Sequence, residues 1–318
     1  MKEHDIPGVP SSSVHPLPPA TDPGRVSVII PVYNRRRLLE RAVTSVREQT
    51  FANWELLIVD DGSSDGSAEY AAELAAGDPR IRQMRNGRAR GPGGARNAGI
   101  LASTGGYIAF LDSDDFWLPD KLAAQMSYLA NAPGAKAVGT DCYVGGTTES
   151  ARLANRYPTI DNAAHTVFAT IIRNKQFWIY TPTVLLSRDV FARIPLFDES
   201  LIRCEDLVMW LTINQSFGWH YVAQPLAVID VDPARNDDYK PADKRQVPEG
   251  LFHMRFVRDV ERHVNIDGAM RKTLRRERAR PDYLFWRGRE RLEARDPTGL
   301  FFYLGALGAR LSEKLLNR

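Results

Sequence analysis

Two clusters of aspartates could hold a divalent cation or a nucleotide. One run reads Asp60-Asp61-Gly62-Ser63 and the other reads Asp112-Ser113-Asp114-Asp115. Neighbouring carboxylates repel one another unless a cation or a hydrogen-bond donor offsets them, and a set of oxygen ligands suits Mg²⁺ or Mn²⁺. The second run is not an EF-hand loop, because Trp117 stands where that loop needs glycine. Aspartates also cap helices, and for one cluster alone that alternative stays open.

A basic, glycine-rich stretch at residues 88–97, RARGPGGARN, could bind phosphate. Glycines allow close approach of the backbone, and a helix that begins here would direct backbone N–H groups and Arg96 at anionic oxygens. The stretch fails the dinucleotide-binding pattern, because Arg96 occupies the position of the third glycine, and it lacks the Gly-Lys-Ser/Thr of a P-loop. An ordinary turn before a helix is the alternative.

A pair of acids, Glu205-Asp206, begins the helix expected at 205–215. Acids in a first helical turn interact favourably with the helix dipole, so the pair alone is compatible with a structural role. A carboxylate in this place could also act as a general base that takes the proton of an attacking hydroxyl. No Ser/His/Asp or Cys/His arrangement is apparent, which favours direct displacement over a covalent enzyme intermediate.

Alternating strand and helix patterns predict the scaffold that brings these residues together. Short apolar runs predict strands at 26–31, 54–60, 81–85, 107–111, 137–142, 183–187 and 220–230. Apolar residues at helical spacing predict helices at 36–49, 67–76, 93–103, 120–131 and 205–215. Repeated β-α units imply an α/β fold with a mostly parallel, Rossmann-like sheet flanked by helices. Ligands of such a sheet bind beyond the carboxyl ends of its strands, so both aspartate clusters should share one edge.

Composition and length limit which class of protein the chain can belong to and how it is divided. Its 318 residues are 43% hydrophobic and 25% charged, which excludes collagen-like, wholly disordered and disulfide-scaffold proteins. Residues 1–24 contain six prolines and no apolar segment, which predicts a flexible Pro-rich leader and no signal peptide. We expect a catalytic domain at 25–247 and a basic helical extension at 248–318. Apolar runs such as 299–308 fall short of the ~18 residues that a membrane span needs. The two cysteines indicate free thiols in a reducing compartment, so we expect a cytoplasmic location.

These motifs, taken in order and spacing, resemble those of the family 2 glycosyltransferases. The resemblance covers about residues 25–230. The segments that carry it are 26–34, 59–67, 94–99, 110–115 and the pair Glu205-Asp206. It implies a GT-A fold and an inverting, metal-dependent transfer of one sugar from a nucleotide diphosphate-sugar, with a UDP- or dTDP-sugar favoured, to an acceptor hydroxyl in cell-envelope polysaccharide, glycolipid or other glycoconjugate synthesis.

The resemblance also implies which residues contact the nucleotide-sugar. They are Pro31, Val32, Tyr33, Asp61, Arg96, Asp112 and Ser113. Pro31, Val32 and Tyr33 would surround the nucleobase, and Asp61 would accept a hydrogen bond from its ring N–H. Asp112 would contact the ribose, and Arg96 would lie along the nucleotide.

Metal and catalytic roles follow from the same resemblance. Asp114 would hold Mn²⁺ or Mg²⁺ at the two donor phosphates, with Asp115 beside it. Asp206 would be the general base, and Glu205 would position the acceptor or the loop. Many relatives have a histidine where this chain has Asp232, which is either an oxygen ligand in its place or a solvated loop acid.

Two other functions stay open. A sugar nucleotidyltransferase would need a glycine-rich phosphate loop after the first strand, where Tyr33-Asn34-Arg35-Arg36-Arg37 stands. A catalytically decayed nucleotide-sugar-binding module is supported only by Asp230 and Asp232, which replace the basic groups of many relatives.

The C-terminal region holds the excess of positive charge. From Leu251 onward there are 16 basic and 9 acidic residues, a net charge of +7, whereas the first 250 residues carry −4. Basic and aromatic residues together fit peripheral contact with a membrane, which would bring the enzyme to a glycan or lipid-linked acceptor at the inner face of the plasma membrane. A solvated basic face on helices that pack against the catalytic domain or a partner subunit is the alternative. No nucleic-acid-binding module accompanies the charge, so no nucleic-acid partner is expected.

Overall fold

The structure is a computed structural model that describes residues 17–145, 152–153, 179–201, 205–230 and 268–278, and the single residues 260, 284, 287, 298, 304 and 306. The chain divides into two compact units. The first comprises Met1–Asn162 and Trp178–Pro241, and the second comprises Ala163–Phe177 and Ala242–Arg318. All the described strands belong to the first unit.

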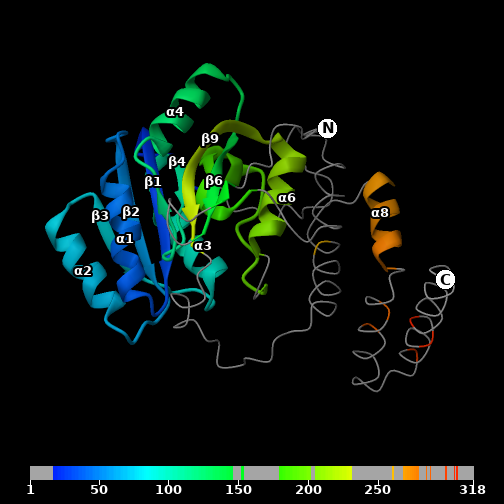
Figure 1. Ribbon diagram of the computed structural model, residues 1–318, viewed down its shortest axis with the longest axis horizontal. Helices are drawn as coiled ribbons and strands as arrows, with labels where there is room; N and C mark the ends of the chain where they lie inside the picture. The colour runs from blue at the N-terminus through cyan, green and yellow to red at the C-terminus, as the bar shows by residue number, and fades with distance from the viewer. Residues whose placement is uncertain are drawn as a thin grey trace. The chain divides into compact units, whose positions relative to one another are not determined.

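Alternating strands and helices build the first half of the sheet. In chain order they are β1 (Asp22–Val32), α1 (Arg36–Arg47), β2 (Trp54–Asp60), α2 (Ser67–Gly77), β3 (Ile81–Arg85), α3 (Pro92–Ala102) and β4 (Gly105–Phe110). Strand β1 pairs in parallel with β2 and β4, and β2 pairs in parallel with β3. Helices flank these strands (Figure 1), so the predicted α/β fold is confirmed. Strand β2 is buried along its whole length, because a parallel sheet covered on both faces exposes neither side of its central strands.

The second half of the sheet mixes strand directions. Its elements are β5 (Phe116–Trp117), α4 (Lys121–Asn131), β6 (Ala137–Val144), β7 (Arg152–Leu153), η2 (Thr181–Thr183), β8 (Leu185–Ser187), η3 (Arg188–Ala192), α6 (Glu205–Phe217) and β9 (His220–Ile229). The strand order is β3-β2-β1-β4-β8-β6-β9-β5, with β7 beside β6. Strand β8 is antiparallel to β4 and β6, whereas β6 and β9 are parallel. Strands β5 and β8 have only two and three residues, too few for sequence periodicity to indicate their direction.

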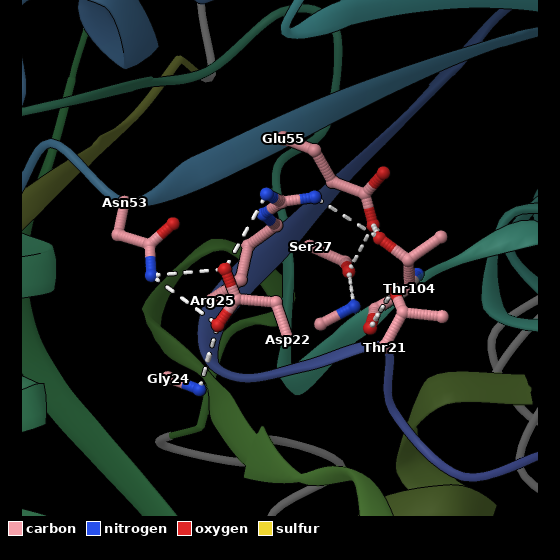
Figure 2. Close-up of polar contacts among 9 residues, drawn as sticks. Thr21, Asp22, Gly24, Arg25, Ser27, Asn53, Glu55 and Thr104 are labelled. Atoms are coloured by element: carbon pink, nitrogen blue, oxygen red, sulfur yellow. Dashed lines mark hydrogen bonds and ion pairs between the residues drawn. The ribbon is translucent and has the colours of Figure 1, made fainter.

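A buried glutamate joins three strands at the amino edge of the sheet (Figure 2). Glu55 Oε1 accepts hydrogen bonds from Ser27 Oγ at 2.6 Å, from the Thr104 backbone N–H at 2.6 Å and from Thr104 Oγ1 at 2.8 Å. Burial alone would raise the pKa of Glu55, but these hydrogen bonds outweigh it and lower the pKa below its usual value. The cluster therefore ties the starts of β1, β2 and β4 together at the edge opposite the predicted site.

Strand β1 begins at Asp22, inside the range predicted for the leader. Asp22 pairs with Gly105, and the Thr21 backbone N–H donates to the Thr104 carbonyl at 3.0 Å. A Cβ added at Gly106 would lie 2.2 Å from the Pro23 carbonyl oxygen, so glycine allows this close approach. The domain boundaries at 24 and 247 stay predictions.

Helix α8 (Gly268–Arg278) is the part of the predicted C-terminal extension that the structure describes as a continuous element. Met270, Thr273 and Leu274 are buried, at helical spacing. The basic residues Arg271, Lys272, Arg275, Arg276 and Arg278 are exposed. Within the described parts of the chain, no helix combines the length and apolar character required to cross a membrane.

Candidate functional site

The loops that follow β1 and β2 are hydrogen-bonded to each other at the carboxyl edge of the sheet. Asn34 adopts a left-handed backbone conformation with φ 51°, which asparagine tolerates better than most residues. Its backbone N–H donates to Ser63 Oγ at 3.0 Å, and its side-chain Oδ1 accepts from the Ser64 backbone N–H at 2.8 Å. Val32 is buried in the core, whereas Tyr33 is half-buried.

The two aspartates of the first cluster have different partners. The carboxylate of Asp60 accepts from the backbone N–H groups of Gly62 at 3.0 Å and Ser63 at 3.2 Å, so it shapes its own turn. The carboxylate of Asp61 accepts from Asn86 Nδ2 at 2.5 Å and from the Gly91 backbone N–H at 2.8 Å. Each carboxylate oxygen has a second lone pair, so Asp61 can still accept a hydrogen bond from a ligand.

The stretch predicted to bind phosphate forms the start of α3 and packs against protein groups. A Cβ added at Gly94 would lie 1.9 Å from the Ala89 carbonyl oxygen, so only glycine fits there. A Cβ added at Gly93 would meet Glu205 Cγ at 3.4 Å. The start of α3 therefore lies directly beside the start of α6.

Arg96 lies between two of the predicted site carboxylates. Its Nη1 donates to Glu205 Oε1 at 2.7 Å and its Nη2 donates to Asp112 Oδ1 at 2.6 Å. Burial alone would lower the pKa of Arg96, but the charges of Asp112 and Glu205 outweigh it and raise the pKa. Burial and the charge of Asp206 raise the pKa of Glu205 to about 7, although Arg96 opposes this shift. The sequence indicated an anionic partner for Arg96, and in the structure the anions are the protein's own carboxylates.

Asp206 lies beside Glu205 in the first turn of α6. Its Oδ2 accepts from Thr181 Oγ1 at 3.3 Å and its Oδ1 accepts from the Leu207 backbone N–H at 2.8 Å. Burial raises the pKa of Asp206, and Arg96 opposes the shift. Asp206 is half-buried, whereas Glu205 is buried. The two acids also differ in their partners: Glu205 is bound by a guanidinium, whereas Asp206 has only a hydroxyl and a backbone donor as hydrogen-bond partners among the described residues.

The second aspartate cluster forms a tight turn after β4. The Asp115 backbone N–H donates to the Asp112 carbonyl at 3.0 Å, and Asp115 Oδ1 accepts from the Asp230 backbone N–H at 2.8 Å. Asp115 is 4% exposed and Ser113 is 7% exposed, so both side chains are buried. The Asp114 side chain is 24% exposed. In this turn, a ligand can therefore reach the carboxylate of Asp114 as well as that of Asp112.

A divalent cation fits this turn if a ligand or water completes its coordination. Burial and the charges of Asp112 and Asp230 raise the pKa of Asp114, while Arg35 Nη1, 3.8 Å from Asp114 Oδ2, opposes the shift. Nearby negative charge of this kind favours a bound cation. In the described ranges, no three His, Cys, Asp or Glu side chains converge on one point. Mg²⁺ is commonly held by one or two carboxylates plus substrate phosphates, so a pair of aspartates is sufficient protein contribution. The predicted metal ligand Asp232 lies outside the described residues.

Two residues of the site, Arg41 and Thr181, were not expected from the sequence, and Asn97 lies in the predicted phosphate-binding stretch with no role assigned to it there. Arg41 on α1 donates to the Asp114 carbonyl and, at 2.7 Å, to Asp230 Oδ2. Thr181 donates to Asp206, and Asn97 binds the backbone of Phe197. The partners of Arg41 and Thr181 are distant in sequence, so no local motif indicates these two residues.

Comparison with known proteins was consistent with this geometry. Residues 27–193 match the family model described as "Glycosyl transferase family 2". The UDP-Glc:alpha-D-GlcNAc-diphosphoundecaprenol beta-1,3-glucosyltransferase WfgD of Escherichia coli is 44% identical over 104 residues, which are 33% of this chain and 40% of that protein. An uncharacterized glycosyltransferase of Rickettsia felis is 34% identical over 222 residues, 68% of this chain and 35% of that protein. The succinoglycan biosynthesis protein ExoO of Rhizobium meliloti is 35% identical over 199 residues, 60% of this chain and 56% of that protein. The matched segments thus span less than half the length of the first two relatives.

Two solved structures share the fold at low sequence identity. Staphylococcus aureus TarS 1–349 in complex with UDP-GlcNAc has a TM-score of 0.63 at 14% identity, covering 90% of this chain and 89% of that chain. The mannosyltransferase PcManGT from Pyrobaculum calidifontis, in complex with GDP-Man and Mn²⁺, has a TM-score of 0.54 at 16% identity, covering 94% of this chain and 78% of that chain. These similarities confirm the predicted GT-A fold.

Proposed function

The chain belongs to glycosyl transferase family 2, and we propose that it moves one sugar from a nucleotide diphosphate-sugar to an acceptor hydroxyl, with inversion at the anomeric carbon. The observation that carries the proposal is the convergence of Asp112, Arg96 and Glu205, which brings the donor-side turn and the acid pair to one place. Asp206 lies near enough to Asp112 for that charge to raise its pKa. In this proposal the donor and the base therefore share one site.

Asp206 acts as the general base in this proposal. A sugar hydroxyl is a poor nucleophile, so a carboxylate takes its proton while the oxygen attacks the anomeric carbon in one displacement. Asp206 suits this role because its carboxylate is half-buried and has no cationic hydrogen-bond partner among the described residues. Glu205, bound to Arg96, positions the acceptor or the first turn of α6.

The loops after β1, β2 and β4 bind the nucleotide. Tyr33 and Pro31 flank the base, Asp61 accepts a hydrogen bond from the ring N–H, and Asp112 with Ser113 receives the ribose. Uracil and thymine have such a ring N–H, as guanine does, and a UDP- or dTDP-sugar is the proposed donor. The fold shared with TarS, solved with UDP-GlcNAc, supports a nucleotide-sugar in this place.

Asp114 holds a divalent cation in this proposal, and Asp232 is a further proposed ligand. A bound Mn²⁺ or Mg²⁺ would stabilise the negative charge that grows on the leaving diphosphate. The crowded carboxylates of the Asp112–Asp115 turn and the Mn²⁺ of PcManGT support this assignment.

The proposed acceptor is a glycan on a lipid carrier, at the cytoplasmic face of the cell membrane. The name of the WfgD relative specifies a sugar-diphosphoundecaprenol acceptor, and other relatives are named for succinoglycan and teichuronic acid biosynthesis. Five exposed basic residues on α8 support contact with anionic lipid. Co-sedimentation with anionic liposomes at low salt tests this contact, and its absence would remove the membrane part of the proposal.

A donor screen tests the proposed function without knowledge of the acceptor. Nucleotide-sugars are compared for binding by calorimetry and for slow hydrolysis, each with and without Mn²⁺. We expect one UDP- or dTDP-sugar to bind, and to bind more tightly with the metal. Failure of every nucleotide-sugar to bind in the presence of Mn²⁺ would contradict the proposal.

A further inference from the structure

Two adjacent residues of α3 bind the segment that leads into the acid pair. Asn97 Nδ2 donates to the Phe197 carbonyl at 2.8 Å, and Asn97 Oδ1 accepts from the Phe197 backbone N–H at 2.9 Å. Arg96 then bonds Glu205 in the first turn of α6. Helix α3 therefore anchors both the segment before α6 and the start of α6 itself.

Arg96 also connects this segment to the end of β4. Its second terminal nitrogen donates to Asp112, which belongs to the turn proposed to bind the ribose. Asp112 and Glu205 are thus held by the two arms of one planar guanidinium, at 2.6 and 2.7 Å. A planar fork fixes two carboxylates relative to each other, which a lysine ammonium does much less well.

We propose that Arg96 is a positioning residue that sets the geometry between the donor-binding aspartate and the acid pair, and that it does not contact the nucleotide. This inference rests on the proposed function and deepens it. Arg96 is only 4% exposed, and both of its terminal nitrogens are bound to carboxylates. A nucleotide phosphate would have to displace Asp112 or Glu205 to reach it.

The stability of the fold alone does not account for this arginine. Buried ion pairs are often no more stable than well-packed apolar side chains of similar volume. Arg96 Nε is also buried, with no hydrogen-bond partner among the residues that the structure describes. Such an unsatisfied donor is costly, which indicates that the arginine serves the geometry of the site.

Substitution of Arg96 by lysine tests the proposal against a matched control. Arg188 is buried like Arg96, but it donates to Ser103 Oγ at 2.6 Å and to the Pro18 carbonyl at 3.0 Å, away from the acid pair. Purified Arg96→Lys and Arg188→Lys proteins are compared with wild type by circular dichroism, by kcat and donor KM, and by hydrogen exchange of peptides covering 205–211. We expect Arg96→Lys to lower kcat about 100-fold, with donor KM changed less than about threefold and with faster exchange in α6. Arg188→Lys should leave kcat and α6 exchange unchanged.

Three results would overturn the proposal. One is an unchanged kcat in folded Arg96→Lys, and another is a rise in donor KM that accounts for the whole loss, which would make Arg96 a nucleotide contact. The third is unchanged exchange at 205–211.

If wild type transfers no sugar from any donor, the proposed function fails, and the exchange comparison alone decides whether Arg96 holds α6. If Arg96→Lys does not fold, Glu205→Gln weakens the same link, and we expect faster exchange of α6 in that variant; unchanged exchange would overturn the proposal.

Discussion

Arg41 on α1 is ion-paired at 2.7 Å to Asp230, which follows β9 and is 189 positions away in the chain. The Asp230 side chain is 1% exposed, and the same guanidinium donates to the Asp114 carbonyl. One arginine therefore connects the first helix, the turn after β4 and the end of β9. We expect the position of the turn that carries Asp114 to depend on this connection.

Replacing Arg41 by glutamine should destabilise the protein more than loss of a surface ion pair. The change removes the guanidinium that is paired with the buried Asp230 carboxylate, and breaking a buried pair costs about 3 kcal/mol in free energy of unfolding. Lys136→Gln is the control, because the side chains of Lys136 and Asp189 are 34% and 56% exposed, and loss of this surface pair should cost less than about 1 kcal/mol. Urea denaturation of both variants measures the difference, and equal losses would contradict the role of Arg41.

Replacing Asp206 by asparagine should remove sugar transfer and preserve donor binding. Loss of a general base lowers kcat by roughly 10²- to 10⁴-fold, while the nucleotide contacts are untouched. Calorimetry of donor binding and a transfer assay separate the two effects. Asp120→Asn is the control, since Asp120 accepts a hydrogen bond from Thr50 at the start of α4 and should leave kcat unchanged. Full activity of Asp206→Asn would refute the assignment of the base.

Asp114 and Asp115 should respond differently to substitution, although they are adjacent. Asp114→Asn should raise the Mn²⁺ concentration needed for half-maximal activity roughly tenfold or more, because its carboxylate is the proposed ligand. Asp115→Ala should instead lower the free energy of unfolding, because Asp115 is buried and accepts from the Asp230 backbone N–H, and alanine has no acceptor to replace it. Metal titrations and urea denaturation of the two variants distinguish these roles. An unchanged metal requirement in Asp114→Asn would count against a metal at this position.

Replacing Glu55 by glutamine should lower the free energy of unfolding at pH 7 by about 2 kcal/mol, because charged hydrogen bonds to Ser27 and Thr104 are weakened. The folded pKa of Glu55 lies below its usual 4.5, so its contribution is present above that value and is lost as the pH falls through the folded pKa. The difference between wild type and Glu55→Gln should therefore shrink in acid. Unfolding curves at pH 7 and pH 3 measure it. Donor KM should not change, since Glu55 lies at the amino edge of the sheet.

Local patterns predicted the scaffold and the edge on which the site is built. Apolar spacing is a property of neighbouring residues, so strands such as Trp54–Asp60 and helices such as Lys121–Asn131 could be located from the sequence within about two residues. Parallel strands place their carboxyl ends at one edge, which explains why the turns with Asp61 and Asp112 were correctly expected there.

Long-range charge pairing could not be predicted in the same way. The basic stretch with Arg96 indicated phosphate, because Glu205 is 109 residues away and nothing local marks it as the partner. Asp230 was interpreted only as a loss of basic character, although Arg41 supplies a positive charge at that place from α1. The short strand Phe116–Trp117 has too few residues to show a period.

The contact between position 94 and the Ala89 carbonyl has a consequence for protein engineering. Any side chain larger than hydrogen at this position would push α3 away from its loop, and α3 carries the arginine that binds Glu205 and the asparagine that binds Phe197. In a saturation library selected for altered nucleotide specificity, position 94 would tolerate almost nothing, although glycine offers no functional group to a substrate. Diversity is better directed to Tyr33 and the loop that carries Arg90, whose guanidinium lies 5.3 Å above the Tyr33 ring. Residues 93–97 should stay fixed as the frame against which new specificities are selected.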